Sequence, residues 1–141
     1  MKTDIVLAGV GGQGILTIAA IIGQVAVDQG WNVKQSEVHG MAQRGGSVLA
    51  HLRLAQNAVK SDLITEGSAE LLVAMEPLEA LRQMSFLSKD GFLLSNTVPV
   101  KNIKNYPDLD KVLAELQKHP KQLLLDAEEV AKNAGSVRCS N

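Results

Sequence analysis

Gly9-Val10-Gly11-Gly12-Gln13-Gly14 is the stretch of this sequence that decides its fold. The apolar residues 3–8 before it predict a buried strand, and the apolar residues 15–29 after it predict a helix. Three of its glycines have the G-x-G-x-x-G spacing of a loop that holds phosphate groups against the free N–H groups of a helix. Because this short motif is weakly specific, a structural alternative stays open, in which the glycines only allow a sharp turn.

The helix that follows is apolar nearly all round from residue 15 to residue 27. This pattern predicts a helix that is buried on most of its faces, against a sheet and against a partner. Gly30 is placed to end the helix in the left-handed conformation, and residues 31–36 predict a second strand. The order β-α-β favours parallel pairing of the two strands and an α/β fold.

The rest of the chain continues the alternation of strands and helices. Residues 47–54 alternate between apolar side chains and the polar Ser47, His51 and Arg53, which predicts a half-covered strand, antiparallel to its predecessor, with His51 on the exposed face. Further strands are expected at 59–64, 71–75, 92–96 and 122–125, a turn at 89–91, and helices at 78–87, 108–118 and 127–134. Asp108 and Asp126 are expected to cap the last two helices, and Gly135 to end the last one. The fold class expected is three-layer α/β/α, Rossmann-like, with a mostly parallel but mixed sheet.

Composition excludes several classes of function. The chain has 141 residues, one domain by the usual length prior, and a formal net charge of −1, which does not favour a nucleic-acid or membrane-surface partner. A single cysteine, Cys139, excludes an internal disulfide and an iron–sulfur cluster held by this chain alone. Because the apolar run 15–27 is too short to span a bilayer, we expect a cytoplasmic protein.

A second stretch with chemical character is Glu37-Val38-His39-Gly40-Met41-Ala42-Gln43-Arg44-Gly45-Gly46. It is too polar and glycine-rich for a core, and it follows a strand, where α/β folds place binding loops. A guanidinium beside two glycines suits bidentate binding of a carboxylate or phosphate. His39 is an acid–base candidate, although a loop histidine bonded to backbone is the preferred interpretation. Metal-ligand spacing is absent from the sequence.

Glu37 has two interpretations that the sequence leaves open. An acidic residue about 20 positions beyond the glycines holds a ribose hydroxyl in dinucleotide-binding folds, and Glu37 lies close to that position. Alternatively, Glu37 is a loop carboxylate that pairs with Arg44.

The two stretches together resemble the gamma-type domain of the 2-oxoacid:ferredoxin oxidoreductases. The resemblance rests on residues 9–15 and on residues 36–48, and it continues weakly through Glu66-Gly67 and residues 71–79. The His39-Gly40-Met41 form of the loop points to the indolepyruvate branch of that family. Members of the family usually continue beyond the equivalent of Asn141, so we interpret residues 1–141 as a single gamma-type domain without the family's C-terminal segment, which makes self-association an expectation.

The resemblance implies the small subunit of an enzyme that oxidatively decarboxylates an aryl pyruvate, forms an acyl-coenzyme A and passes electrons to ferredoxin. In the family, thiamine diphosphate and iron–sulfur clusters do this chemistry. We therefore expect both in a larger partner subunit, coenzyme A as co-substrate, no cofactor bound by this chain alone, and no activity of the isolated chain. The residues expected to contact a cofactor or another subunit, none with an assigned catalytic step or metal, are Gly9, Gly11, Gly12, Gln13, Gly14, Glu37, His39, Gly40, Arg44, Gly45 and Gly46.

Two other classes of function fit the same residues. The glycine motif and Glu37 also suit a stand-alone dinucleotide-binding oxidoreductase, although that function leaves the Arg44 loop unexplained. A non-catalytic interaction module, in which both loops dock a partner, is the third class.

Overall fold

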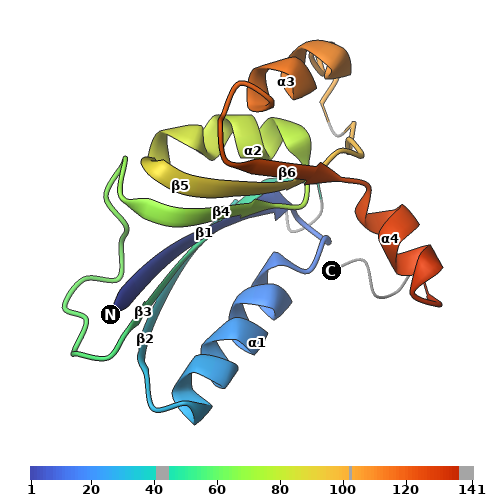
Figure 1. Cartoon of the computed structure of the whole chain (residues 1–141). Coiled ribbons are helices and arrows are strands. Elements are labelled where there is room, and N and C mark those ends of the chain that lie inside the picture. Colours follow the sequence, from blue (N-terminus) through green and yellow to red (C-terminus); the bar gives the residue numbers. More distant parts are fainter. Residues whose placement is uncertain (41–44, 102, 137–141) are drawn as a thin grey trace.

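The structure is a computed structural model that describes residues 1–40, 45–101 and 103–136, with only the backbone of His39. Its centre is a six-stranded sheet with the strand order β2-β3-β1-β4-β5-β6 (Figure 1). The strands are β1 (Lys2–Val10), β2 (Asn32–His39), β3 (Ser47–Ala55), β4 (Ala69–Ala74), β5 (Leu87–Asn96) and β6 (Gln122–Leu125). The helices are α1 (Ile15–Asp28), α2 (Pro77–Gln83), α3 (Leu109–Leu116) and α4 (Ala127–Asn133), with a 3₁₀ turn, η1, at Met84–Phe86.

The sheet is mixed and mostly parallel, as expected. β1, β4, β5 and β6 pair in parallel, whereas β3 pairs antiparallel with both β1 and β2. In Figure 1, α2 and α3 lie on one face of the sheet and α1 lies on the other. One apolar cluster fills the α2 side and a second fills the α1 side. The three-layer α/β/α class is therefore confirmed.

The expected pairing of the first two strands is wrong, because β3 lies between β1 and β2. The apolar side chains of β3 suit a central strand: Leu52 packs on the α1 side, while Leu49 packs on the other. β2 carries Lys34 and Glu37 and occupies the sheet edge, where charged side chains discourage pairing with another chain.

α1 is buried along a narrow stripe only. Its buried residues are Ile15, Ala19, Gly23 and Ala26. Its exposed apolar side chains are Leu16, Ile21, Val25 and Val27. The prediction of a helix buried on most of its faces is therefore wrong for this chain by itself, because the sheet supplies one contact surface. The expected contact of α1 with a partner stays a prediction.

Several local predictions are confirmed by the caps of the helices. The side chains of Asp108 and Asp126 accept hydrogen bonds from the first turns of α3 and α4, at 3.0 and 2.9 Å respectively. Gly30 follows α1 with a φ of 78°, and Gly135 follows α4 with a φ of 111°. Such caps can be predicted from the sequence because a cap involves only residues within one turn of the helix end.

Two other local predictions are wrong. Residues 59–64 form no strand, because Arg53 Nη1 holds their backbone in a loop by donating to the carbonyl oxygens of Ser61 and Leu63, at 3.1 and 3.0 Å. Residues 89–91 lie inside β5 instead of in a turn. Gly91 serves close packing there, since a Cβ atom on it would lie 2.7 Å from the carbonyl oxygen of Ala69.

The expectation that His51 faces solvent is also wrong. The loop between β3 and β4 covers that side of β3 and leaves His51 only 5% exposed. Its Nδ1 accepts a hydrogen bond from the backbone N–H of Ile64 at 3.0 Å, and its ring lies edge-on to Phe86 at 4.9 Å between centroids. Burial lowers the pKa of His51, and the positive charge of Arg53 lowers it further.

This lowered pKa predicts a loss of stability in mild acid. Below the unfolded-state pKa of about 6.5, the unfolded chain binds a proton that folded His51 does not, so the free energy of unfolding falls as the pH falls. One group contributes at most about 1.4 kcal/mol per pH unit. We expect His51→Asn, which keeps an acceptor for Ile64 and does not titrate, to flatten this dependence in urea melts between pH 7.5 and 5. An unchanged slope in the variant would contradict the assignment.

Candidate functional site at the carboxyl edge of the sheet

The glycine turn lies where β1 ends, at the carboxyl edge of the parallel strands, the usual ligand-binding edge of an α/β sheet. Gly12 and Gly14 have φ values of 101° and 77°, a conformation that other residues rarely adopt. A Cβ atom on Gly9 would lie 2.7 Å from Cδ1 of Ile15, the first residue of α1. The glycines therefore allow both the turn and the close packing of helix against strand.

The side chain of Gln13 makes hydrogen bonds to the backbone of this chain. Its Oε1 accepts a hydrogen bond from the backbone N–H of Val10 at 2.7 Å, and its Nε2 donates to the carbonyl oxygen of Met75 at 2.9 Å. Asn96 Nδ2 donates to the same Met75 oxygen at 3.1 Å. The side chain amides of Gln13 and Asn96 therefore tie together the carboxyl ends of β1, β4 and β5, and Gln13 supports the turn from within.

The two stretches predicted to form the site meet. The backbone N–H of Gly11 donates to the carbonyl oxygen of Gly46 at 2.8 Å, and the backbone N–H of Gly45 donates to the carbonyl oxygen of Gly11 at 3.3 Å. The backbone of His39, at the end of β2, pairs with Val48 near this edge, and Gly40 follows it. Arg44 lies outside the described residues. The structure thus joins the glycine turn and Gly45-Gly46 into one backbone surface.

Glu37 lies apart from the glycine turn. It belongs to β2, is exposed, and its Oε1 accepts a hydrogen bond from Gln35 Nε2 at 2.5 Å. In dinucleotide-binding folds the ribose-binding acid follows the strand directly beside the first one. Here β3 lies between β1 and β2, so the topology does not bring Glu37 to the position that the dinucleotide alternative requires.

Two buried carboxylates at the same edge were missed by the sequence analysis. Glu76 directly precedes α2 and Glu79 lies in its first turn; they are only 1% and 2% exposed, respectively. Glu79 accepts hydrogen bonds from Ser47 Oγ and from Arg82 Nη1, both at 2.6 Å. Because Ser47 directly follows Gly46, this contact fastens the glycine surface to α2. Glutamate followed by proline, with a second glutamate three positions on, resembles a helix-capping pattern and could have indicated this site.

Glu76 holds the segment before α3 in place. It caps α2 through the N–H of Glu79 at 2.9 Å, and its other oxygen accepts from the N–H of Val100 at 3.3 Å and from the Tyr106 hydroxyl. Burial raises the pKa of Tyr106, and the Glu76 carboxylate raises it further. Tyr106 therefore stays a neutral donor at physiological pH, which suits a structural contact.

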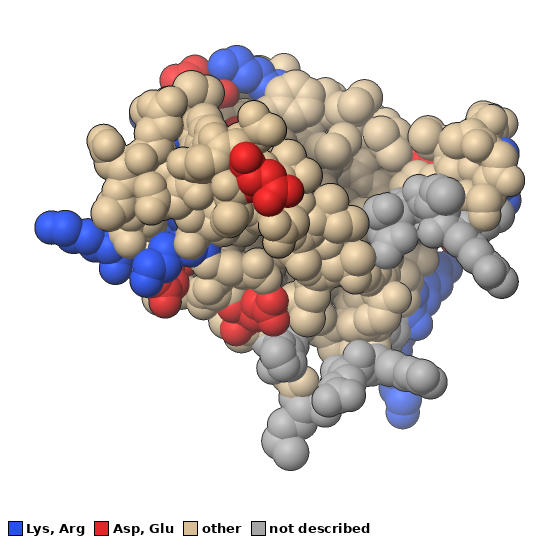
Figure 2. All heavy atoms as spheres, turned by 90° about the horizontal axis from the view of Figure 1, so that it is seen from below, with Lys and Arg blue, Asp and Glu red and all other residues tan. Residues whose placement is uncertain are grey.

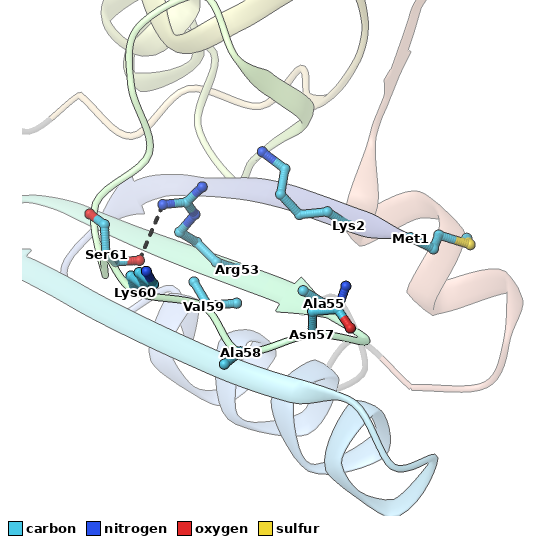
Figure 3. A pocket seen from close by; sticks show the side chains of 9 residues that line it. All are labelled: Met1, Lys2, Arg53, Ala55, Asn57, Ala58, Val59, Lys60 and Ser61. Carbon is cyan, nitrogen blue, oxygen red and sulfur yellow. Dashed lines mark hydrogen bonds between the residues drawn. The ribbon is translucent and has the colours of Figure 1, made fainter.

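The opposite, amino edge of the sheet carries a pocket of about 480 Å³, drawn in Figure 3. Lys2 and Arg53 line the pocket, but both bond to the buried carboxylate of Asp4. Arg53 donates to it from Nε and Nη2 at 2.9 and 3.1 Å, and Lys2 donates from Nζ at 2.7 Å. Burial works to raise the pKa of Asp4, but these hydrogen bonds outweigh it and hold that pKa below its ordinary value. The cations therefore serve the fold here.

The pyruvate ferredoxin/flavodoxin oxidoreductase family matches residues 4–141 of this sequence, which include every part of the carboxyl edge described above. The chain belongs to this family. The resemblance found in the sequence is thereby confirmed.

Relatives in the family include indolepyruvate oxidoreductase subunits. Subunit IorB of Archaeoglobus fulgidus is 43% identical over 100% of this chain and 73% of its own length. Subunit IorB of Pyrococcus horikoshii is 39% identical over 98% of this chain and 72% of its own. The pyruvate/ketoisovalerate oxidoreductases common subunit gamma of Pyrococcus abyssi is 30% identical over 87% of this chain and 63% of its own. The chain is thus a small subunit of a 2-oxoacid:ferredoxin oxidoreductase, as the resemblance implied.

Solved structures confirm the fold. Pyruvate oxidoreductase subunit PORC from Thermotoga maritima has a TM-score of 0.71 at 22% identity, over 99% of this chain and 70% of that chain. The 2-oxoglutarate:ferredoxin oxidoreductase from Magnetococcus marinus has a TM-score of 0.70 at 15% identity, over 99% of this chain and 22% of that chain. The family fold therefore also occurs as one section of a much longer polypeptide.

Two negative findings apply to residues 1–40, 45–101 and 103–136 of this family member. They contain no cluster of three or more His, Cys, Asp or Glu side chains arranged to hold a metal ion. Within the same ranges, no helix has the length and apolar character needed to cross a membrane.

Proposed function

We propose that this chain is the small subunit of an indolepyruvate:ferredoxin oxidoreductase, in the form of a single gamma-type domain. The observation that carries the choice of substrate is the gradient of identity among the relatives. Identity is 38–43% to four indolepyruvate oxidoreductase subunits over 98–100% of the chain, and 30% to the pyruvate/ketoisovalerate subunits over 87%. The resemblance of the His39-Gly40-Met41 form of the second loop to the indolepyruvate branch supports the same choice.

The proposed reaction needs thiamine diphosphate and iron–sulfur clusters, which we assign to another subunit. Indolepyruvate and coenzyme A give an acyl-coenzyme A and CO₂, and the two electrons released pass to ferredoxin. Thiamine diphosphate supplies the decarboxylation chemistry and iron–sulfur clusters carry the electrons. The chain has one cysteine, whereas a cluster needs several thiolates. Asp90-Gly91 and Asn96 are also spaced too closely for a thiamine diphosphate motif, so we assign both cofactors to a larger partner subunit.

The role proposed for this chain is to complete the site from its carboxyl edge. The glycine turn and Gly45-Gly46 offer a backbone surface without bulky side chains. The hydrogen bonds of the Gln13 side chain to Val10 and Met75, and the Ser47–Glu79 hydrogen bond, hold this surface in place. Such a surface allows close approach by a ligand or another subunit. We propose that it contacts coenzyme A or the partner, together with Glu37, His39, Gly40 and Arg44 of the second stretch.

A tagged pull-down from anaerobic extract of the source cells tests this function. We expect a large brown partner that contains thiamine diphosphate and reduces ferredoxin when indolepyruvate and coenzyme A are both supplied. Pyruvate and 2-ketoisovalerate serve as comparison substrates and are expected to react more slowly. Recovery of the chain alone with tightly bound NAD(H) would overturn the proposal in favour of a dinucleotide-binding enzyme. A partner without redox cofactors would overturn it in favour of an interaction module.

A further inference from the structure

Glu76 and Glu79 place two buried carboxylates at the carboxyl edge of the sheet, where the site is proposed. Charged side chains usually stay in contact with solvent, as the Lys and Arg side chains do at the margins of the face drawn in Figure 2. Burying a carboxylate costs free energy that hydrogen bonds and an opposite charge only offset, and apolar side chains in its place are often as stable. The contacts of these two residues therefore favour a role in fixing one conformation of the edge.

The side chain of Glu79 connects α2 to the start of β3. Among the residues that the structure describes, its one hydrogen bond outside α2 is with Ser47 Oγ, at 2.6 Å. Its other oxygen accepts from Arg82 Nη1, and because the Arg82 side chain is 44% exposed, this ion pair contributes little to stability. The helix is capped by Glu76 instead. The contact with Ser47 is therefore what distinguishes Glu79 from an ordinary residue of the first turn.

Ser47 lies at the end of a ladder of backbone hydrogen bonds. It is the first residue of β3 and pairs with Val10, the last residue of β1. Gly45-Gly46 directly precedes it and bonds to Gly11 through two backbone hydrogen bonds. Backbone pairs at the ends of strands open more readily than pairs in the middle. The Ser47–Glu79 hydrogen bond therefore restrains the end of the ladder that carries the glycine surface.

The start of α2 also holds the other segments of this edge. The carbonyl oxygen of Met75 accepts a hydrogen bond from Gln13 Nε2 at 2.9 Å, which attaches the glycine turn. Glu76 accepts from the backbone N–H of Val100 at 3.3 Å and from the Tyr106 hydroxyl, which attaches the segment before α3. A change at the start of α2 is thus transmitted directly to the segments that surround the proposed site.

We infer that Glu79 is a positioning residue of this enzyme, which acts through Ser47 to hold Gly45-Gly46 in place for the use of coenzyme A. This inference rests on the proposed function. Glu79 is assigned no contact with a substrate in this role. Because small displacements of a site surface have large kinetic effects, losing the Ser47–Glu79 hydrogen bond is expected to affect turnover more than folding.

Substitutions of Ser47 in the assembled enzyme test this role. The side chain is exposed, so the chain is expected to fold without its hydroxyl group. We expect Ser47→Ala to lower kcat/KM for coenzyme A by about tenfold and to leave KM for indolepyruvate unchanged. Ser47→Thr keeps a hydroxyl group and is expected to retain most of the activity. Glu79→Ala combined with Ser47→Ala is expected to be no slower than Glu79→Ala alone, because both substitutions remove the same contact.

The matched control is Ser68→Ala. Ser68 directly precedes β4, at the amino edge of the sheet, and its Oγ donates to the carbonyl oxygen of Thr65, also at 2.6 Å. This variant loses a serine hydrogen bond of the same length far along the strands from the proposed site. Its kcat/KM for coenzyme A is expected to equal that of the unmodified enzyme.

The inference and the proposed function fail in different ways. If the unmodified enzyme reduces ferredoxin with indolepyruvate and coenzyme A, but Ser47→Ala behaves like Ser68→Ala, the positioning role is wrong while the proposed function stands. The role is also wrong if Ser47→Ala slows the enzyme only in proportion to a smaller folded fraction, measured by circular dichroism, since the contact then serves the fold alone. If the complex of the unmodified chain has no such activity, the proposed function fails, and the inference fails with it.

Discussion

Asp4→Ala is expected to lower the free energy of unfolding by about 3–5 kcal/mol, one of the largest effects of any single substitution in this chain. Asp4 is completely buried and bonds to two nitrogens of Arg53, whose side chain is only 16% exposed. Removing the carboxylate leaves the guanidinium buried and uncompensated, which costs more than losing the pair as a whole. Arg53 also holds the loop over His51, so the damage extends to that loop.

Urea melts at pH 7 measure this effect, and two further variants serve as controls. Lys2→Ala removes the other, half-exposed partner of Asp4 and is expected to cost about 1 kcal/mol or less. Asp4→Leu combined with Arg53→Met removes both charges and is expected to recover part of the stability lost in Asp4→Ala. A loss below 1 kcal/mol in Asp4→Ala would contradict the assigned role of the pair. Because the pKa of Asp4 is lowered, the stability that its carboxylate contributes is present above about pH 4 and is lost as the pH falls further.

Gly12→Ala is expected to reduce the activity of the assembled enzyme by about tenfold or more, because small displacements of a site surface have large kinetic effects. Gly12 has a φ of 101°, and a Cβ atom on it would have, apart from its two chain neighbours, no atom of the described residues within 4 Å. The methyl group therefore projects from the glycine surface toward whatever binds there. Ferredoxin reduction with saturating indolepyruvate, followed as a function of coenzyme A concentration, measures the effect.

The matched control for this substitution is Gly67→Ala. Gly67 has a φ of 72° and equally open surroundings, but it precedes β4 and so lies at the amino edge of the sheet. Both alanines introduce a similar backbone strain of about 1–2 kcal/mol, but only the one at Gly12 lies at the proposed site. Equal activities of the two variants, after correction for the folded fraction, would show that the glycine turn serves the fold alone.

The parts of the fold that the sequence predicted are those that depend on neighbouring residues. The strand–glycine–helix order, the caps at Asp108 and Asp126 and the alternation along β3 all follow from side chains within a few positions of one another. The place of β3 in the sheet does not follow from such patterns. It depends on the pairing of β3 with both β1 and β2 and on the packing of its side chains against distant parts of the chain.

The candidate site was predictable in part for the same reason. The two glycine stretches were recognised by composition, but their contact through Gly11, Gly45 and Gly46 results from the pairing of β3 with β1. Glu76 and Glu79 have the composition of a polar strand end, and their burial arises only when Tyr106 and Ser47 close over them from distant parts of the chain. His51 was misjudged because a loop later in the sequence covers it.

The insertion of β3 between β1 and β2 also has a consequence for synthesis of the chain. α1 packs against β3 more than against any other strand, yet β3 is translated after it. The helix therefore emerges from the ribosome before its principal packing surface exists, and its apolar stripe stays exposed to solvent until residue 55 has emerged. During that interval the nascent chain presents a nearly uncharged segment to the cell, which is the kind of segment that chaperones bind and that aggregation begins from.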